Sequence, residues 1–253
     1  MTEAKGGDPH RLGELRAMID AIDESVHRLL IQRATVIDEL IEVKGTAKSG
    51  AAFRPGREAD MMRRLAARHT GNLPLGAVEH LWREIISTFT ALQAPFTVSV
   101  GADGDPVGAV ETARFTFGFT VPLKVENRAA DVVSWLEDGG TDKLGLVLLD
   151  RAATAWWNGL EQAQVVARLP FLQRSGNRVR ALVLAPPLAD PVPFEVGCYA
   201  VRGKVPAELP GVETLASANG SILVAARDAA LLEDAGLDIR AVGGYAAPLR
   251  VDG

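Results

Sequence analysis

Apolar residues recur every three or four positions along the first 94 residues, and this spacing predicts three helices. We expect them at about 11–44, at 57–69, and from just after Pro74 to Gln93. The first helix carries the longest apolar stripe, with Leu15, Ile19, Ile22, Val26, Leu29, Ile37 and Leu40 as its members. At about 1.5 Å per residue this helix would be roughly 50 Å long. A small monomer cannot bury such a stripe, so we expect a partner helix from another chain.

Beyond Pro95 the pattern changes to short apolar runs separated by turn-forming residues, and only three of the 14 prolines precede this point. The runs at 96–102, 143–150, 178–187, 194–201 and 221–227 predict strands, and those at 129–139 and 228–236 predict helices. This alternation is typical of α/β domains. The expected fold class is α + α/β: an all-helical domain over 1–94, followed by an appended α/β domain over 95–253.

Composition and charge narrow the function classes. The 253-residue chain has a formal net charge of −5, which argues against a nucleic-acid-binding surface. No apolar run approaches the roughly 20 residues that span a bilayer, and the polar first ten residues resemble no secretory signal. With Cys198 as its one cysteine, the chain forms no internal disulfide and no multi-cysteine metal site. We expect a cytoplasmic protein that binds neither nucleic acid nor membrane.

Two cations fall inside the apolar stripe of the first helix. At 100° per residue, Arg33 and Lys44 lie at about 0° and 20° from Leu15, the centre of the apolar face. A buried cation without a partner costs several kcal/mol, so this face is expected to receive an anion. The two residues are about 16 Å apart along the axis and could hold opposite ends of one small molecule. In an antiparallel pair of such helices, Arg16 of one chain could approach Arg33 of the other.

A simpler interpretation remains open at this point. Long cationic side chains on helices often extend along apolar surface to water, and pairs such as Arg16 and Asp20 are common on protein surfaces. Trp156 and Trp157 are likewise more typical of packing than of a ligand pocket.

Four segments of the first half together resemble the all-helical class of chorismate mutase. They are LRAMIDAIDESVHRLLIQR (15–33), EVK (42–44), FRPGREADMMRRL (53–65) and WREIISTFTALQ (82–93). The RPxRE element in particular resembles the mutase domains fused to prephenate dehydratase. The resemblance implies an intertwined helical homodimer that rearranges chorismate to prephenate, in phenylalanine and tyrosine biosynthesis. It implies no metal and no organic cofactor, because this pericyclic step has no covalent intermediate.

By this resemblance, four residues act directly on the two carboxylates and the ether oxygen of chorismate. Arg33 and Arg16 of the partner chain match the positions that bind the carboxylates. Lys44 and Gln93 match the positions that hydrogen-bond the ether oxygen, which gains negative charge as the C–O bond breaks. Since Gln93 does not titrate, catalysis is expected not to require acid pH.

The second predicted helix contributes two further residues by resemblance. Arg57 matches a site arginine, and Glu58 matches the carboxylate that accepts the substrate hydroxyl. Two positions depart from the family pattern: Arg54 stands where many members have aspartate, and Phe89 where a small polar residue is expected. Each departure removes one contact that the family would make.

The second half resembles parts of other domains. Segment 99–118 resembles the start of a prephenate dehydratase domain, and segment 221–249 resembles the end of an ACT regulatory domain. The dehydratase Thr-Arg-Phe motif is absent, and 159 residues are too few for both domains. We interpret this half as a diverged remnant without dehydratase activity. It could bind an aromatic amino acid effector, contact a partner enzyme or dock onto the mutase dimer.

Three alternative functions stay open. The chain could be a bifunctional chorismate mutase/prephenate dehydratase. The same helical site could eliminate pyruvate from isochorismate. The protein could also be a non-catalytic sensor whose cationic pocket binds an aromatic acid.

Overall fold

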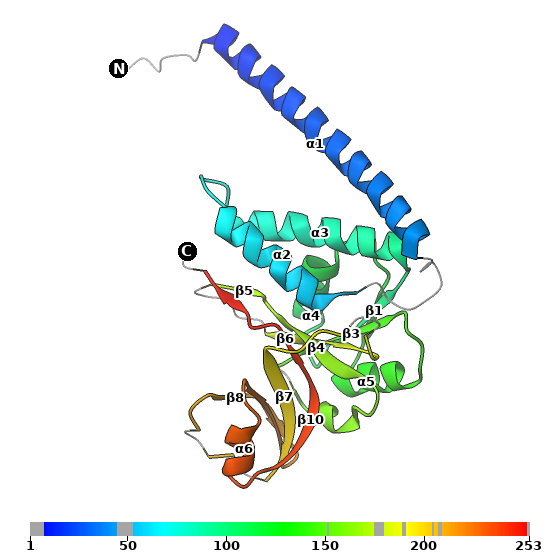
Figure 1. The fold of residues 1–253 in the computed structure, drawn as a ribbon, viewed down its shortest axis with the longest axis vertical. Coiled ribbons are helices and arrows are strands. Elements are labelled where there is room, and N and C mark those ends of the chain that lie inside the picture. The colour runs from blue at the N-terminus through cyan, green and yellow to red at the C-terminus, as the bar shows by residue number, and fades with distance from the viewer. Residues whose placement is uncertain are drawn as a thin grey trace. The chain divides into compact units, whose positions relative to one another are not determined.

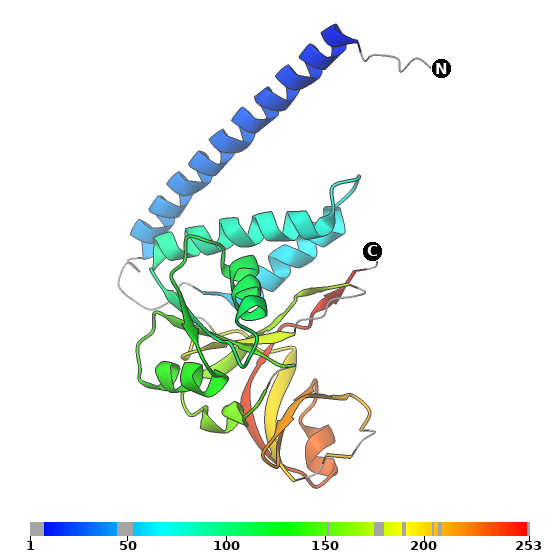
Figure 2. The same cartoon turned by 180° about the vertical axis from the view of Figure 1, so that it is seen from behind.

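The computed structural model describes residues 8–44, 53–150, 152–174, 180–188, 191–203, 205–206 and 209–251. The chain divides into two compact units, 1–47 and 48–253. The first unit holds one long helix, and the second holds every other helix and strand of the described residues (Figures 1 and 2). Within the described ranges, no helix combines the length and apolar character needed to cross a membrane.

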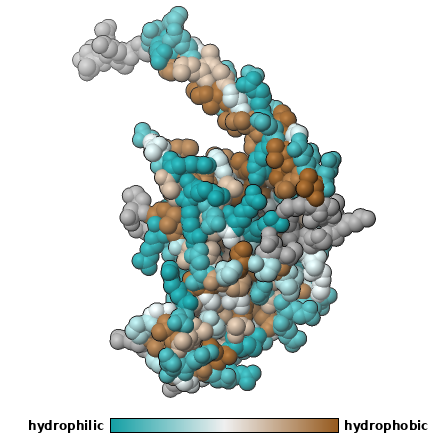
Figure 3. Space-filling model, in the orientation of Figure 1, coloured by the Kyte–Doolittle hydropathy of each residue, from teal (hydrophilic) through white to brown (hydrophobic). Residues whose placement is uncertain are grey.

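The first unit is the helix α1 (Pro9–Lys44), which runs without interruption for 36 residues. It confirms the first predicted helix and starts two residues earlier than expected. Five of its seven stripe residues are exposed, from Leu15 at 41% to Leu29 at 63%, whereas Ile37 and Leu40 are half-buried. Apolar side chains are accordingly visible along α1 in Figure 3. Among the described residues, α1 is the only element of the first unit.

The second unit begins with α2 (Pro55–Arg68) and α3 (Leu75–Gln93), which confirm the other two predicted helices. Pro55 occupies the first turn of α2, where its missing N–H costs no hydrogen bond. At the other end, α3 stops at Gln93, because the following Ala94 is extended and precedes Pro95. The two helices share an apolar cluster in which Met62 and Ile86 pack with Phe171.

A nine-stranded mixed sheet forms the centre of the second unit, in the order β2-β1-β3-β6-β4-β10-β7-β9-β8. These strands are β1 (Thr97–Gly101), β2 (Leu123–Glu126), β3 (Lys143–Leu148), β4 (Gln164–Leu169), β6 (Ala181–Ala185), β7 (Val196–Arg202), β8 (Val212–Ala218), β9 (Ser221–Ala226) and β10 (Asp238–Tyr245). The remaining elements are α4 (Pro106–Phe117), α5 (Ala129–Glu137), a 3-10 turn (Trp156–Gly159), α6 (Ala230–Asp234), and the two-stranded pair β5 (Leu172–Gln173) and β11 (Leu249–Arg250). Pairing is parallel among β1, β2 and β3, and antiparallel from β3 to β6.

Alternate residues of the central strands enter two different cores. In β3, Leu144 and Leu146 face a cluster that includes Phe117 of α4, whereas Val147 joins a cluster that includes Trp157 and α5. Both faces of these strands are therefore buried, which explains their nearly continuous apolar sequence. The tryptophan pair packs within this core: Trp157 is fully buried, and its indole N–H donates to Ser221 Oγ at 2.8 Å.

The α + α/β class expected from sequence is confirmed by these elements. All five predicted strands and both predicted helices of the second half are present, except that residues 178–179 of one predicted strand lie outside the described residues. The sequence analysis did not predict α4, β2, β4, β8 or β10. The compact units do not divide at 94/95: α2 and α3 belong to the same unit as the sheet.

Candidate functional site

Three of the expected site residues lie on α1. The uninterrupted helix keeps Arg33 on the face of Leu15, because residues 18 apart are separated by about five full turns. Arg16 is exposed near the beginning of the helix. Lys44 is the last residue of α1, and its side chain lies outside the described part of the structure.

Two others, Arg57 and Glu58, are neighbours on α2 and point in different directions. Successive residues of a helix are about 100° apart, so two neighbours rarely face one cavity. Arg57 is exposed and lines a cavity of about 520 Å³ together with Arg64 and Glu195. Glu58 faces the interior and lines a different cavity, beside Arg83.

Gln93, the sixth residue, is engaged with its own helix. Its Nε2 donates to the carbonyl oxygen of Phe89 at 3.0 Å, one turn earlier. The side chain lines neither the Arg57 cavity nor the Glu58 cavity. The second unit by itself therefore does not bring its three expected residues together.

Glu58 forms a buried ion pair with Arg83, a residue that the sequence analysis missed. Arg83 Nη1 donates to Glu58 Oε2 at 3.0 Å, and the two side chains are only 7% and 15% exposed. Burial raises the pKa of Glu58 from 4.5 to about 7, and the positive charge of Arg83 opposes this rise only in part. Within the described residues this is the one hydrogen bond of the carboxylate, so Oε1 remains open to a ligand donor.

A second buried carboxylate, Glu79, lies one turn before Arg83 on α3. Burial raises its pKa, while the charges of Arg83 and Arg174 and a hydrogen bond from the Leu172 backbone act in the opposite direction. Negative and positive side chains thus alternate in space, in the order Glu58, Arg83, Glu79, Arg174. The sequence could have indicated that Glu79 and Arg83 are neighbours, because they are four residues apart on one helix face.

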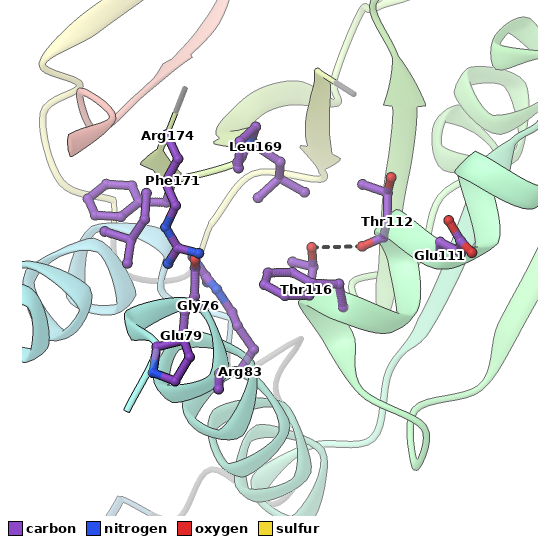
Figure 4. A pocket seen from close by; sticks show the side chains of 14 residues that line it. Gly76, Glu79, Arg83, Glu111, Thr112, Thr116, Leu169, Phe171 and Arg174 are labelled. Atoms are coloured by element: carbon purple, nitrogen blue, oxygen red, sulfur yellow. Dashed lines mark hydrogen bonds between the residues drawn. The ribbon is translucent and has the colours of Figure 1, made fainter. Parts of the chain in front are cut away.

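Figure 4 shows a cavity of about 560 Å³ that is lined by Glu79, Arg83 and Arg174. One wall comes from α3 and the opposite wall from α4, while Leu169 and Phe171 close a third side. The side chains of Arg174 and Arg83 extend toward each other beside Glu79. Among the described residues, no group of three histidine, cysteine or acidic side chains is placed to hold a metal ion.

Comparison with known proteins identifies the family that the first third of the chain matches. Residues 15–94 match the family described as chorismate mutase type II, so the N-terminal part carries a domain of this family. All six expected site residues lie in the matched range. The match includes α2 and α3, which belong to the compact unit of the sheet.

Relatives with this region are named bifunctional chorismate mutase/prephenate dehydratase. The one from Neisseria gonorrhoeae is 39% identical over 84 residues, which is 33% of this chain and 22% of the relative. The one from Pseudomonas aeruginosa is 32% identical over 113 residues, or 43% of this chain and 31% of the relative. The matched segments thus span less than a third of the length of these relatives.

One solved structure is also similar. It is titled "X-ray structure of prephenate dehydratase from Streptococcus mutans", and the similarity covers 60% of this chain and 98% of that chain. The TM-score is 0.37 and the sequence identity 16%. A similarity of this degree does not establish a shared fold.

Proposed function

We propose that the protein is a chorismate mutase that works as a homodimer, with residues 1–94 as the mutase domain and Arg16 contributed across the dimer. The observation that carries the proposal is the family match over 15–94. This range contains the six residues that the sequence resemblance assigns to the site: Arg16, Arg33, Lys44, Arg57, Glu58 and Gln93. The product, prephenate, belongs to aromatic amino acid biosynthesis.

In this proposal, cations hold chorismate in its compact reactive shape. Arg33 and the partner's Arg16 bind the two carboxylates, so that the reacting carbon atoms are held close together. The C–O bond of the ether breaks as the new C–C bond forms, within one molecule and without a proton transfer. Lys44 and Gln93 donate to the ether oxygen, whose negative charge grows in the transition state. For this role Gln93 must exchange its bond to Phe89 for one to the substrate.

The exposed stripe of α1 supports the dimer. An apolar face of this length is unusual on a soluble monomer, and a second copy of α1 in antiparallel orientation would cover it. Such a pair places Arg16 of one chain beside Arg33 of the other. The α3 helix also leaves Leu81 and Leu92 more than half exposed, at 54% and 59%. We propose that these residues face the helices of the partner as well.

In the second unit, the carboxyl group of Glu58 is already held in a fixed orientation. Arg83 holds Oε2, which fixes the orientation of the carboxyl group and leaves Oε1 for the substrate hydroxyl. Arg57 is exposed and free to turn toward a ligand that α1 helices of a dimer would present. We propose that residues 95–253 carry no dehydratase activity; the names of the relatives keep the bifunctional enzyme as the second candidate.

The test is a product analysis with the full chain at neutral pH. Chorismate consumption is followed by absorbance, and the products are identified by mass spectrometry. Prephenate alone is the expected product. Pyruvate released from isochorismate would identify a lyase, and phenylpyruvate formed from added prephenate would identify a dehydratase. Stabilisation by chorismate without turnover would identify a sensor and contradict the proposed activity.

A further inference from the structure

All residues that line the cavity of Figure 4 belong to the second unit. Its volume of about 560 Å³ is within the range of small-molecule sites, roughly 300–1,000 Å³. Its lining combines apolar side chains with Glu79, Arg83 and Arg174 on one side and Glu111 of α4 on the other. Apolar walls with a few charged groups are typical of ligand pockets. Neither Arg57 nor Gln93 lines it.

Arg174 gives the cavity an unsatisfied donor. Its Nη2 is buried and has no hydrogen-bond acceptor among the described residues. The guanidinium packs directly over Gly76 in the first turn of α3, where a Cβ would overlap Nη1. A buried donor without an acceptor costs roughly 1–3 kcal/mol. A small rotation of the guanidinium would bring this N–H to an acceptor atom of a ligand, which would recover that free energy.

Arg83 provides a second guanidinium to the same cavity. Its only hydrogen bond among the described residues is from Nη1 to Glu58, so its other N–H groups remain for a ligand. The planar forks of two arginines match a carboxylate better than a single-point anion. Glu79, buried beside them, limits how much negative charge the site accepts. The electrostatics therefore favour a monoanion over a phosphate dianion.

The rest of the lining is mostly apolar, apart from Thr112 and Thr116 of α4 and the carboxylate of Glu111. Phe115 of α4 is stacked on His80, with ring centroids 5.1 Å apart, and is 37% exposed. Phe171 and Leu172 also line the cavity; both are buried and contribute apolar surface. A flat ring placed between these walls would remove apolar surface from water at about 25 cal/mol per Å².

We propose that this cavity is a binding site for a small monocarboxylate with an apolar ring. The carboxylate binds Arg174 and Arg83, and the ring lies between Phe115 and Phe171. The site can be measured without chorismate, and among the residues that form it only Arg83 also serves the proposed mutase site, by holding Glu58.

The test is calorimetric titration of the full chain with 3-phenylpropionate, compared with the neutral amide 3-phenylpropionamide. We expect millimolar or tighter binding of the acid and at least about tenfold weaker binding of the amide, the cost of a charge-assisted hydrogen bond. Arg174→Gln removes the guanidinium, and Gly76→Val displaces it. Each substitution is expected to weaken binding of 3-phenylpropionate at least about tenfold. Arg68→Gln, which removes an exposed arginine of α2 outside the cavity, should leave binding unchanged.

Four results would overturn the proposal: no heat with the acid, equal affinity for the amide, equal affinity for inorganic phosphate, or full affinity in Arg174→Gln. The last would show that the probe occupies another cationic site, such as the proposed mutase site. Methyl NMR signals of Leu169 and Leu172 in the unmodified chain locate the probe without any variant. If they do not shift while heat is released, the cavity is not the site.

Discussion

The helices α1 and α3 both carry an apolar stripe in the sequence, but the structure treats the two stripes differently. On α1 most of the stripe is exposed, because no second helix or strand of the described residues belongs to its unit. On α3, the buried face includes the polar residues Glu79, Arg83 and Ser87. This face lies a quarter turn or more around the helix from the exposed Leu81 and Leu92 of the apolar stripe. An apolar stripe therefore shows that a face needs a partner, without showing that the same chain provides it.

The polar residues on the buried face of α3 are tolerated because each finds a partner. Arg83 is paired with Glu58, and Ser87 donates to the carbonyl oxygen of Thr116 on α4 at 3.2 Å. Buried polar groups that are paired cost little, whereas an exposed apolar face loses the benefit of burial. The part of the α3 stripe that stays exposed, at Leu81 and Leu92, could then contact the partner chain in the proposed dimer.

Replacement of Lys44 with alanine is expected to have the largest effect of any change on α1. Loss of a preorganised positive charge at a developing oxyanion should reduce kcat/KM for chorismate by several kcal/mol of transition-state stabilisation. Arg28→Ala is the matched control, because Arg28 lies about 140° away from the stripe and pairs with Glu24 at 3.7 Å. Full activity of Lys44→Ala in steady-state kinetics would contradict the assignment.

A charge placed in the α1 stripe should break the dimer. Ile22→Glu puts a carboxylate where we expect helix–helix contact, and loss of one buried isoleucine alone is worth about 1.5–3 kcal/mol. The dimer dissociation constant should rise at least about tenfold in analytical ultracentrifugation. Ile31→Glu is the control, since Ile31 is similarly exposed (55% against 59%) but lies on the opposite face. Equal effects of the two substitutions would show that the stripe is not the interface.

The buried pair of α2 and α3 should be visible in the pH dependence of stability. Glu58 has a folded-state pKa of about 7, above its ordinary value of 4.5, so ionisation is more costly in the folded state. The free energy of unfolding should therefore fall as pH rises from about 4.5 to about 7, by an amount on the order of 1–3 kcal/mol. Glu58→Gln should remove this slope in denaturant titrations.

The control for that measurement is Glu111→Gln, which changes an exposed glutamate of α4 and should keep the slope of the unmodified chain. Comparing slopes rather than absolute stabilities removes any constant cost of leaving Arg83 beside a neutral group. If the slope persists in Glu58→Gln, another group such as Glu79 is responsible for it.

Much of the fold could be predicted from local signals. The period of the stripes and the prolines at 55, 74 and 95 located all three helices, and the apolar runs located five strands. The helix α4 was missed because its sequence, PVGAVETARFTF, begins with Pro and Gly and shows little segregation of polar and apolar residues. Strand β10 was missed because Gly243 and Gly244 interrupt its apolar pattern.

The candidate site was less accessible to sequence reasoning, since it depends on contacts between distant residues. The pairing of Glu58 with Arg83 joins positions 25 residues apart on different helices, and no local pattern specifies it. Arg174 approaches α3 only because position 76 is glycine, a close contact that becomes evident in three dimensions. Family resemblance located the six proposed mutase residues, but their assembly into one site stays a prediction that needs the second chain.

Mixed dimers test whether α1 acts across two chains. In a dimer of one Arg16→Ala chain and one Arg33→Ala chain, one site carries both substitutions and the other carries neither. Random mixing makes half of the dimers mixed, so activity should recover to about a quarter of the wild-type value. The two variants measured separately are the control, and both should be nearly inactive. No recovery on mixing would show that Arg16 and Arg33 serve the same chain.

The smallest expected effect concerns Gln93, whose amide donates without titrating. The rate of the unmodified enzyme should therefore not fall between about pH 5 and 7, and any change caused by ionisation of Glu58 should be a rise. Gln93→Glu supplies the contrast: a carboxyl group donates to the ether oxygen only when protonated, so its activity should fall as pH rises through the pKa of the new side chain. A steep fall in the unmodified enzyme, measured as log kcat/KM against pH, would mean that a titrating acid rather than Gln93 donates to the ether oxygen.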